Sequence, residues 1–197
     1  MNTTDSSIQT LATRPKRADA RRNYEKVLGA AREAFAEGGE STSLEEIARR
    51  AGVGIGTLYR NFPNRQALLE AIYVDEVEEV CRVAAELERD VDPWEALSSW
   101  VARFIGYMAT KRALAGELLN YLDRDAPLFT GCREVLFAAG EPLLKRAQEA
   151  GAVRQDVSIG DVMQMVMGIA KIPTSEPGQT EHIVRIALDG LRYPTHD

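Results

Sequence analysis

The side chains that most often carry out catalysis or bind metal ions are few and widely separated along this 197-residue chain. The two cysteines, Cys81 and Cys132, lie in apolar helical patterns without a Cys-x-x-Cys spacing, which predicts buried thiols in a reducing compartment. The two histidines, His182 and His196, complete no metal-ligand spacing, and no nucleophile–base pair or glycine-rich phosphate loop is visible. The sequence therefore predicts no metal site, no cofactor and no enzyme.

One segment, residues 43–65, instead has the spacing of a helix-turn-helix. Such a unit needs a small residue where its helices cross and a glycine at the turn, and Ala48 and Gly52 supply them. Ser43 and Glu46 predict a capping box that opens the first helix. Helices of this length are marginal alone, so the unit must pack on the preceding helix, which contains Phe35. The apolar residues expected inside the unit are Ile47, Ala51, Val53 and Leu58.

The remaining elements that position this segment also read as helices, and strand-like alternation is absent. Apolar periodicity predicts a first helix that ends at Gly38-Gly39 and a long helix that is capped by Asn64 and runs to about Leu87. Pro93 begins a helix whose apolar stripe spans 97–108, and further helices are expected at roughly 112–122, 127–150, 158–171 and 177–191. Pro142 should kink or interrupt the third-last of these. The predicted fold class is all-α, with about nine helices.

The charge of the chain is unevenly distributed around a net value of −6. Residues 1–70 carry a balance of +2 and residues 71–197 a balance of −8. The cationic excess is greatest between Arg14 and Arg32, and phosphate contact needs only such a local surface. Residues 1–17 read as a flexible basic arm, whose Arg14, Lys16 and Arg17 either enter a minor groove or make loose phosphate contacts or none. No apolar run is long enough to span a membrane and no signal peptide is visible, which predicts a cytoplasmic protein.

The run Ala51-Gly-Val-Gly-Ile-Gly-Thr-Leu-Tyr-Arg-Asn-Phe-Pro-Asn-Arg-Gln-Ala-Leu-Leu69 resembles the DNA-binding signature of the TetR family of bacterial regulators. The resemblance covers about residues 20–72. Beyond them it is limited to the expected number and length of the helices. It implies that the helix beginning near Gly54 approaches base edges in the major groove. It also implies hydroxyl contacts to phosphates from Thr57 and Tyr59, and a phosphate contact from Arg65. The residues to which it assigns DNA binding are Ser43, Gly54, Ile55, Gly56, Thr57, Tyr59, Arg60, Asn61, Asn64 and Arg65.

Two of these positions depart from the family pattern, and two have structural alternatives. Gly54 stands where Ser or Thr often caps the recognition helix, and Asn61 stands where His is frequent. Tyr59 could instead pack against the first helix, and Arg65 could be a solvated surface charge.

Aromatic and methionine residues of the C-terminal two-thirds read either as plain core or, together, as the lining of a cavity for an apolar ligand. They are Trp100, Phe104, Tyr107, Met108, Tyr121, Phe129, Phe137, Met163 and Met167. The last two helices carry apolar faces that suit a two-fold four-helix dimer interface, the arrangement usual in the family. The residues expected in this interface are Val162, Val166, Ile169, Ala170, Ile183, Val184, Ala187 and Leu191.

With these features, the resemblance implies a homodimeric repressor that binds double-stranded operator DNA and is released by a small, unidentified, apolar ligand. The expected division is an arm at 1–17, a helix-turn-helix domain at 18–66 and a ligand-binding and dimerisation domain at 67–197. A small all-α enzyme, an architectural DNA-binding protein and a regulator that senses a protein partner are the alternatives.

Overall fold

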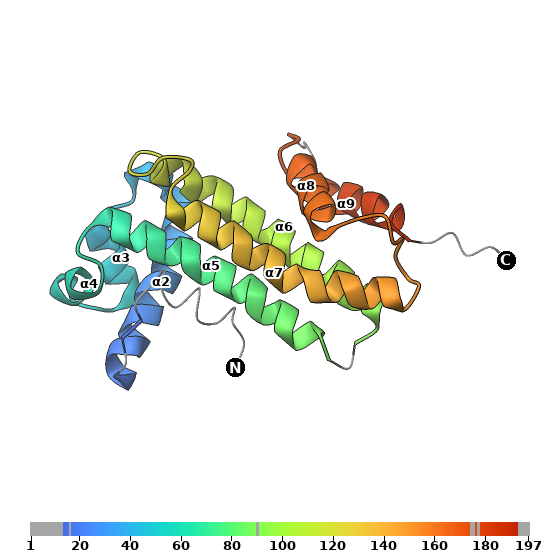
Figure 1. Cartoon of the computed structure of the whole chain (residues 1–197). Coiled ribbons are helices and arrows are strands. Elements are labelled where there is room, and N and C mark those ends of the chain that lie inside the picture. The colour runs from blue at the N-terminus through green and yellow to red at the C-terminus, as the bar shows by residue number, and fades with distance from the viewer. Residues whose placement is uncertain (1–13, 16, 90, 174–175, 177, 193–197) are drawn as a thin grey trace. The chain divides into compact units, whose positions relative to one another are not determined.

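The computed structural model of the chain describes residues 14, 15, 17–89, 91–173, 176 and 178–192, which are largely helical (Figure 1). The elements are α2 Ala18–Gly38, the 3₁₀ turn η1 Gly39–Ser41, α3 Leu44–Ala51, α4 Ile55–Asn61, α5 Arg65–Leu87, α6 Pro93–Leu118, α7 Pro127–Glu149, α8 Ile159–Ile169 and α9 Gln179–Asp189. Within the described residues, β-type pairing is limited to one isolated bridge between Val153 and Arg192. The prediction of an all-α fold is confirmed. Most of the predicted arm, residues 1–13 and 16, lies outside the described residues.

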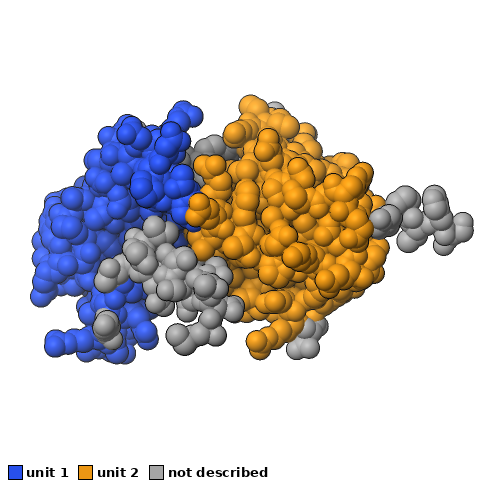
Figure 2. All heavy atoms as spheres, in the orientation of Figure 1, with its two compact units in different colours: residues 1–76, 110–132 blue, residues 77–109, 133–197 orange. Residues whose placement is uncertain are grey.

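The chain divides into two compact units, which Figure 2 shows in different colours. The first comprises residues 1–76 and 110–132, and the second comprises residues 77–109 and 133–197. The helices α5, α6 and α7 each contribute residues to both units. The end of α6 therefore belongs to the same compact unit as α2, α3 and α4.

The first unit is built around the apolar stripe predicted for α2. Tyr24, Leu28 and Phe35 are buried on this helix, together with Val27 and Ala31 from the same stripe. The other buried residues of the unit come from several helices: Ile47, Ala48, Leu58, Phe62, Leu68, Leu69, Ile72 and Tyr73. Burial of this set supports helices that are too short to be stable alone.

The second unit is centred on Trp100 of α6, whose side chain is fully buried and whose indole Nε1 donates a hydrogen bond to the carbonyl of Val80 at 3.2 Å. The amide of Arg154, after α7, donates to the carbonyl of Leu191, after α9, at 2.9 Å. A capping box between Ser158 and Asp161 begins α8.

One helix prediction for the C-terminal region is wrong, and another is wrong in one of its two alternatives. The helix that begins at Pro93 does not stop near 108 but continues to Leu118, so no separate helix begins at about 112. No proline lies between residues 108 and 118, and a glycine inside a helix lowers the stability of the helix only modestly, so nothing ends α6 there. Of the two effects predicted for Pro142, interruption is not observed, because α7 runs through this residue from Pro127 to Glu149. A kink at Pro142 stays a prediction.

Candidate nucleic-acid interface

The turn between α3 and α4 has the geometry that the glycine spacing predicts. Gly52 adopts a left-handed backbone conformation with a φ of 65°, which residues other than glycine rarely adopt. Its amide donates to the carbonyls of Ala48 and Arg49, and the amide of Val53 also donates to Ala48, at 3.0 Å. The chain therefore leaves α3 sharply and begins α4 at once.

One side of α4 is anchored in the core of the first unit. Leu58 is fully buried, and Phe62, which ends the helix, is buried as well. The ring of Phe62 lies 4.8 Å from the ring of Tyr24 on α2. Arg50 also joins α3 to α2 through an ion pair with Glu37, with Nη1 and Oε2 separated by 2.7 Å. These contacts fix the orientation of α4 in its unit.

The other side of α4 faces solvent. Ile55 is 39% exposed and Tyr59 is 44% exposed, so Tyr59 is not buried against α2. Gly54 and Gly56 are exposed too, and a Cβ built on either would meet no atom within 4 Å. This surface offers an aliphatic side chain, a phenol and bare backbone to whatever approaches it.

Three further residues of α4 are connected to one another by hydrogen bonds. The Arg60 guanidinium donates to the Thr57 hydroxyl at 2.9 Å and to the Gly56 carbonyl at 3.1 Å. The Asn61 amide donates to the Thr57 carbonyl at 2.9 Å and is half-buried. Arg60 thus lies back along the helix that carries it, with its charge on the exposed side.

Ser43 and Asn64 are exposed residues that cap the starts of α3 and α5. The Ser43 hydroxyl accepts from the Glu46 amide at 3.1 Å, and the Asn64 side chain accepts from the Ala67 amide at 2.8 Å. The Glu46 carboxylate binds Arg49 and Arg50 instead of completing the predicted capping box. Hydrogen bonds from Arg49 and then Arg50 lower the pKa of Glu46 to about 2.

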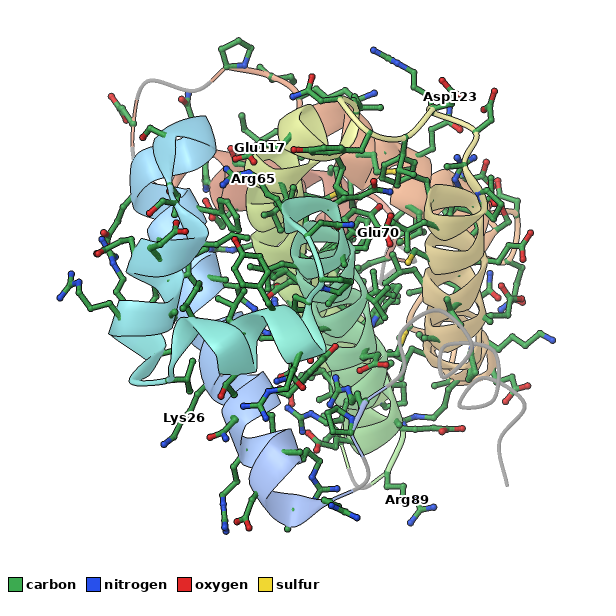
Figure 3. All side chains as sticks on the ribbon, turned by 90° about the vertical axis from the view of Figure 1, so that its left-hand side faces the viewer. Lys26, Arg65, Glu70, Arg89, Glu117 and Asp123 are labelled. Atoms are coloured by element: carbon green, nitrogen blue, oxygen red, sulfur yellow. The ribbon has the colours of Figure 1, made fainter. Side chains whose placement is uncertain are left out.

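Arg65, to which the resemblance assigns a phosphate contact, is half-buried and has partners within the protein. Its side chain is only 21% exposed and forms an ion pair with Glu117 of α6, with Nη2 and Oε2 at 2.6 Å (Figure 3). The same guanidinium donates to backbone carbonyls of the α2–α3 connection and lies over the ring of Phe35. Arg65 is therefore not the solvated charge of the alternative interpretation, because its guanidinium has partners within the protein.

Of the described arm residues, Arg14 has a partner within the protein and Arg17 is exposed. Arg14 binds Asp75 of α5, which also binds Arg32 of α2. Arg17 is exposed, and Lys16 lies outside the described residues. Lys26, which was not singled out from the sequence, points away from α2 into solvent (Figure 3). The sequence feature that could have pointed to Lys26 is the cationic excess between residues 14 and 32, because Lys26 lies within that segment.

Residues expected to line a ligand cavity fall into both units. Tyr121 and Phe129 belong to the first unit, where Tyr121 is exposed and Phe129 packs edge-on against Tyr73, with 5.4 Å between ring centroids. The others belong to the second unit: Trp100, Phe104, Tyr107 and Met163 are buried, while Met108, Phe137 and Met167 are half-buried. The rings of Trp100 and Phe104 are 6.2 Å apart, and those of Phe104 and Tyr107 are 5.7 Å apart.

Half of the residues expected in a dimer interface are buried within the chain itself. Val162, Val166, Val184 and Leu191 belong to the core of the second unit, because α8, α9 and the residues directly after α9 pack on their own chain through these positions. Ile169, Ala170, Ile183 and Ala187 are half-buried. The large apolar residues that do face solvent here are Ile172 and Ile186, which are 49% and 60% exposed.

The described residues hold neither a metal-binding cluster nor a membrane-spanning helix. No group of three or more potential ligands among His, Cys, Asp and Glu is placed to hold a metal ion. No described helix combines the length and apolar character needed to cross a bilayer.

The fold and the exposed side of α4 define the class of protein: a helix-turn-helix DNA-binding protein. The family model for "Bacterial regulatory proteins, tetR family" matches residues 27–72. A second model, "Transcriptional regulator SbtR-like, C-terminal domain", matches residues 92–193. The chain belongs to the TetR family of bacterial transcriptional regulators. Members of this family are DNA-binding regulators and not enzymes, which confirms the prediction that the chain is not an enzyme.

Individual relatives agree with this assignment. The chain is 31% identical to the HTH-type transcriptional regulator UidR of Escherichia coli strain K12 over 73% of this chain and 76% of that protein. It is 33% identical to the HTH-type transcriptional regulator SAR0097 of Staphylococcus aureus, over 57% of this chain but only 60% of that relative. The crystal structure of the TetR transcriptional regulator SCO0520 from Streptomyces coelicolor matches with a TM-score of 0.77 and 39% identity, covering 86% of this chain and 98% of that one.

Proposed function

We propose that this regulator is a cytoplasmic repressor that binds a palindromic operator as a homodimer and leaves it when a small apolar ligand binds. In this proposal residues 1–17 are an arm, residues 18–66 bind DNA, and residues 67–197 bind the ligand and form the dimer.

The observation that carries the proposal is the exposed side of α4. A recognition helix must bring its first residues against base edges in the major groove. Gly54 and Gly56 leave open space around their backbone, so this end of α4 can approach a duplex closely. Ile55 then offers an apolar contact to a thymine methyl group, and Tyr59 a hydroxyl to a phosphate.

A dimer is supported by exposed apolar surface at the C-terminal end of the chain. Ile172 and Ile186 are large, exposed and apolar, and Ile183 lies one helical turn before Ile186 on α9. A two-fold pairing through this surface would present two copies of α4 to two half-sites, about 34–36 Å apart on the duplex.

The ligand site of this proposal is in the second unit, beside the aromatic side chains of Trp100, Phe104 and Tyr107. A nearly complete switch between DNA-bound and free states would need the ligand to prefer one state by about 5 kcal/mol.

The proposal is tested with the duplex that the wild-type protein enriches from a random-sequence library, which should be palindromic. Gly56→Glu should eliminate binding to this duplex, because a carboxylate on the open side of α4 would meet phosphates. Gly56→Ala is the matched control, and it should raise the free energy of unfolding by about 0.5–1 kcal/mol through helix propensity. Normal binding by a folded Gly56→Glu protein would refute the placement of the recognition helix.

The release step is tested separately, by fluorescence anisotropy of the enriched duplex. Small apolar compounds that raise the thermal midpoint of the protein should also dissociate the complex. A compound that stabilises the protein and leaves the complex intact would contradict release as the response.

A further inference from the structure

The guanidinium of Arg65 is held by several groups of the first unit. Nε and Nη2 donate to Glu117 Oε2 at 2.9 and 2.6 Å. Nη1 donates to the carbonyl of Thr42, and Nη2 also reaches the carbonyl of Gly39 at 3.4 Å. The Phe35 ring lies beneath the guanidinium carbon, with its centroid at 4.7 Å. Each of the three nitrogens therefore has a partner inside the protein.

The two carbonyls belong to the connection that leads from α2 into α3. Thr42 is buried, and its hydroxyl donates to the Ala34 carbonyl of α2 at 2.9 Å. Its amide donates to the Gly39 carbonyl at 3.2 Å, which closes the connection into a tight turn. The next residue, Ser43, is the cap of α3 and one of the residues implied to contact DNA. Arg65 thus fixes the backbone immediately before Ser43.

The charges of this pair are placed against the preference of both helices. Arg65 is the first residue of α5, an end that favours anions, and Glu117 lies in the last turn of α6, an end that favours cations. The Glu117 side chain is also only 6% exposed. A buried carboxylate needs a paired cation. Each of these two charges is therefore stabilised by the other charge and not by the dipole of its own helix.

We propose that Arg65 and Glu117 are positioning residues for DNA binding, which hold the 39–42 connection and through it the start of α3, and that Arg65 does not contact phosphate. This inference rests on the proposed function. It assigns a role to Glu117, which lies outside the 27–72 segment that matches the family's DNA-binding model. Figure 3 shows the two labelled side chains next to each other.

Lysine at position 65 separates positioning from phosphate contact. A lysine keeps the positive charge that a phosphate needs, but it cannot reproduce the forked geometry that joins a carboxylate to two carbonyls. Arg65→Lys and Glu117→Gln should therefore each weaken binding to the enriched duplex by about ten- to a hundredfold. The slope of log affinity against log salt should stay unchanged, because no phosphate contact is lost.

Hydrogen–deuterium exchange of the free protein supplies a measurement that does not depend on DNA. Amides of residues 39–46 should exchange faster in both variants, while those of 179–189 should exchange as in the wild type. If the wild-type protein bound no duplex, the proposed function would fail, and the exchange result would still test the positioning role.

A double variant covers the case in which the single variants fold poorly. Arg65→Glu with Glu117→Arg restores an ion pair and gives both helix ends favourable charges. A carboxylate at position 65 still cannot donate to the carbonyls of Gly39 and Thr42, so this variant should fold and bind DNA weakly. Wild-type affinity and exchange in Arg65→Lys and Glu117→Gln would overturn the inference. So would an Arg65→Ala variant whose salt slope falls by about one per subunit while Glu117→Gln binds normally.

Discussion

The indole of Trp100 lies against the backbone of Gly140, so closely that no larger residue fits there. A Cβ built on Gly140 would lie 2.6 Å from Trp100 Cζ3, nearer still to Cη2, and 2.9 Å from Ile159 Cδ1. Trp100 is also held at its other edge by the hydrogen bond to the Val80 carbonyl. Gly140 therefore sets how near α7 comes to the side chain around which the second unit is built.

Replacing Gly140 by alanine should lower the free energy of unfolding by about 1–3 kcal/mol, because the indole would have to move within a packed core. Thermal or urea unfolding measures this change, and near-ultraviolet circular dichroism reports the indole environment. Gly168→Ala is the control, since a Cβ there meets no atom within 4 Å. That variant should be neutral or slightly stabilising. Equal stability of the two variants would contradict the close packing.

Tyr59 and Ile55 should affect DNA binding in different ways. Tyr59→Phe removes only an exposed hydroxyl and should cost about 0.5–1.5 kcal/mol of binding free energy per subunit, with little change in salt slope. Ile55→Ala should change the preference among base substitutions in the enriched duplex more than the affinity for random DNA. Titrations on matched and mismatched duplexes across salt measure both effects. Altered base preference in Tyr59→Phe alone would reverse the two assignments.

Glu46 should make stability depend on pH in the acid range. Hydrogen bonds from Arg49 and Arg50 lower its pKa from 4.5 to about 2 in the folded protein. A carboxyl group whose pKa is lower in the folded than in the unfolded protein stabilises the folded state. This stabilisation is complete at pH values above the unfolded pKa, and it is lost as the pH falls from about 4.5 to about 2. Glu46→Gln should therefore reduce the acid-induced loss of thermal stability in that interval.

The control for this prediction is Glu45→Gln, which removes a carboxylate from the same turn of α3. Thermal midpoints measured between pH 2 and pH 6 compare the two variants with the wild type. An identical pH profile for Glu46→Gln and the wild type would show that the Arg49 and Arg50 contacts do not stabilise the folded state.

The exposed isoleucines of the second unit should carry the dimer. Ile186→Glu should convert dimers into folded monomers at micromolar concentration and abolish operator binding, because a buried unpaired carboxylate opposes association. Sedimentation velocity measures the change, with Gln179→Glu on the same helix as the control. A wild-type protein that is already monomeric, or an Ile186→Glu protein that stays dimeric, would exclude this surface.

The sequence by itself determined the local geometry of the DNA-binding segment. Ser43 and Asn64 accept hydrogen bonds from amides three residues onward, and Gly52 ends α3 with a positive φ. These signals succeed because a cap or a turn involves residues within one helical turn of each other. For the same reason, the end of α2 and the boundaries of α3 and α5 follow from the pattern of glycines, caps and apolar stripes.

Only the tertiary structure decided what each of these elements faces. Arg65 and Glu117 are 52 residues apart, and no local spacing links an arginine at one helix start to a carboxylate at another helix end. The apolar stripes of α8 and α9 likewise predicted that one side of each helix is buried, but not which partner covers it. In the structure Val166 and Val184 lie in the core of their own chain, whereas Ile186 is exposed. Because the hydrophobic effect is non-directional, an apolar stripe determines only that one side of a helix is buried. Which partner covers that side depends on close packing in the tertiary structure.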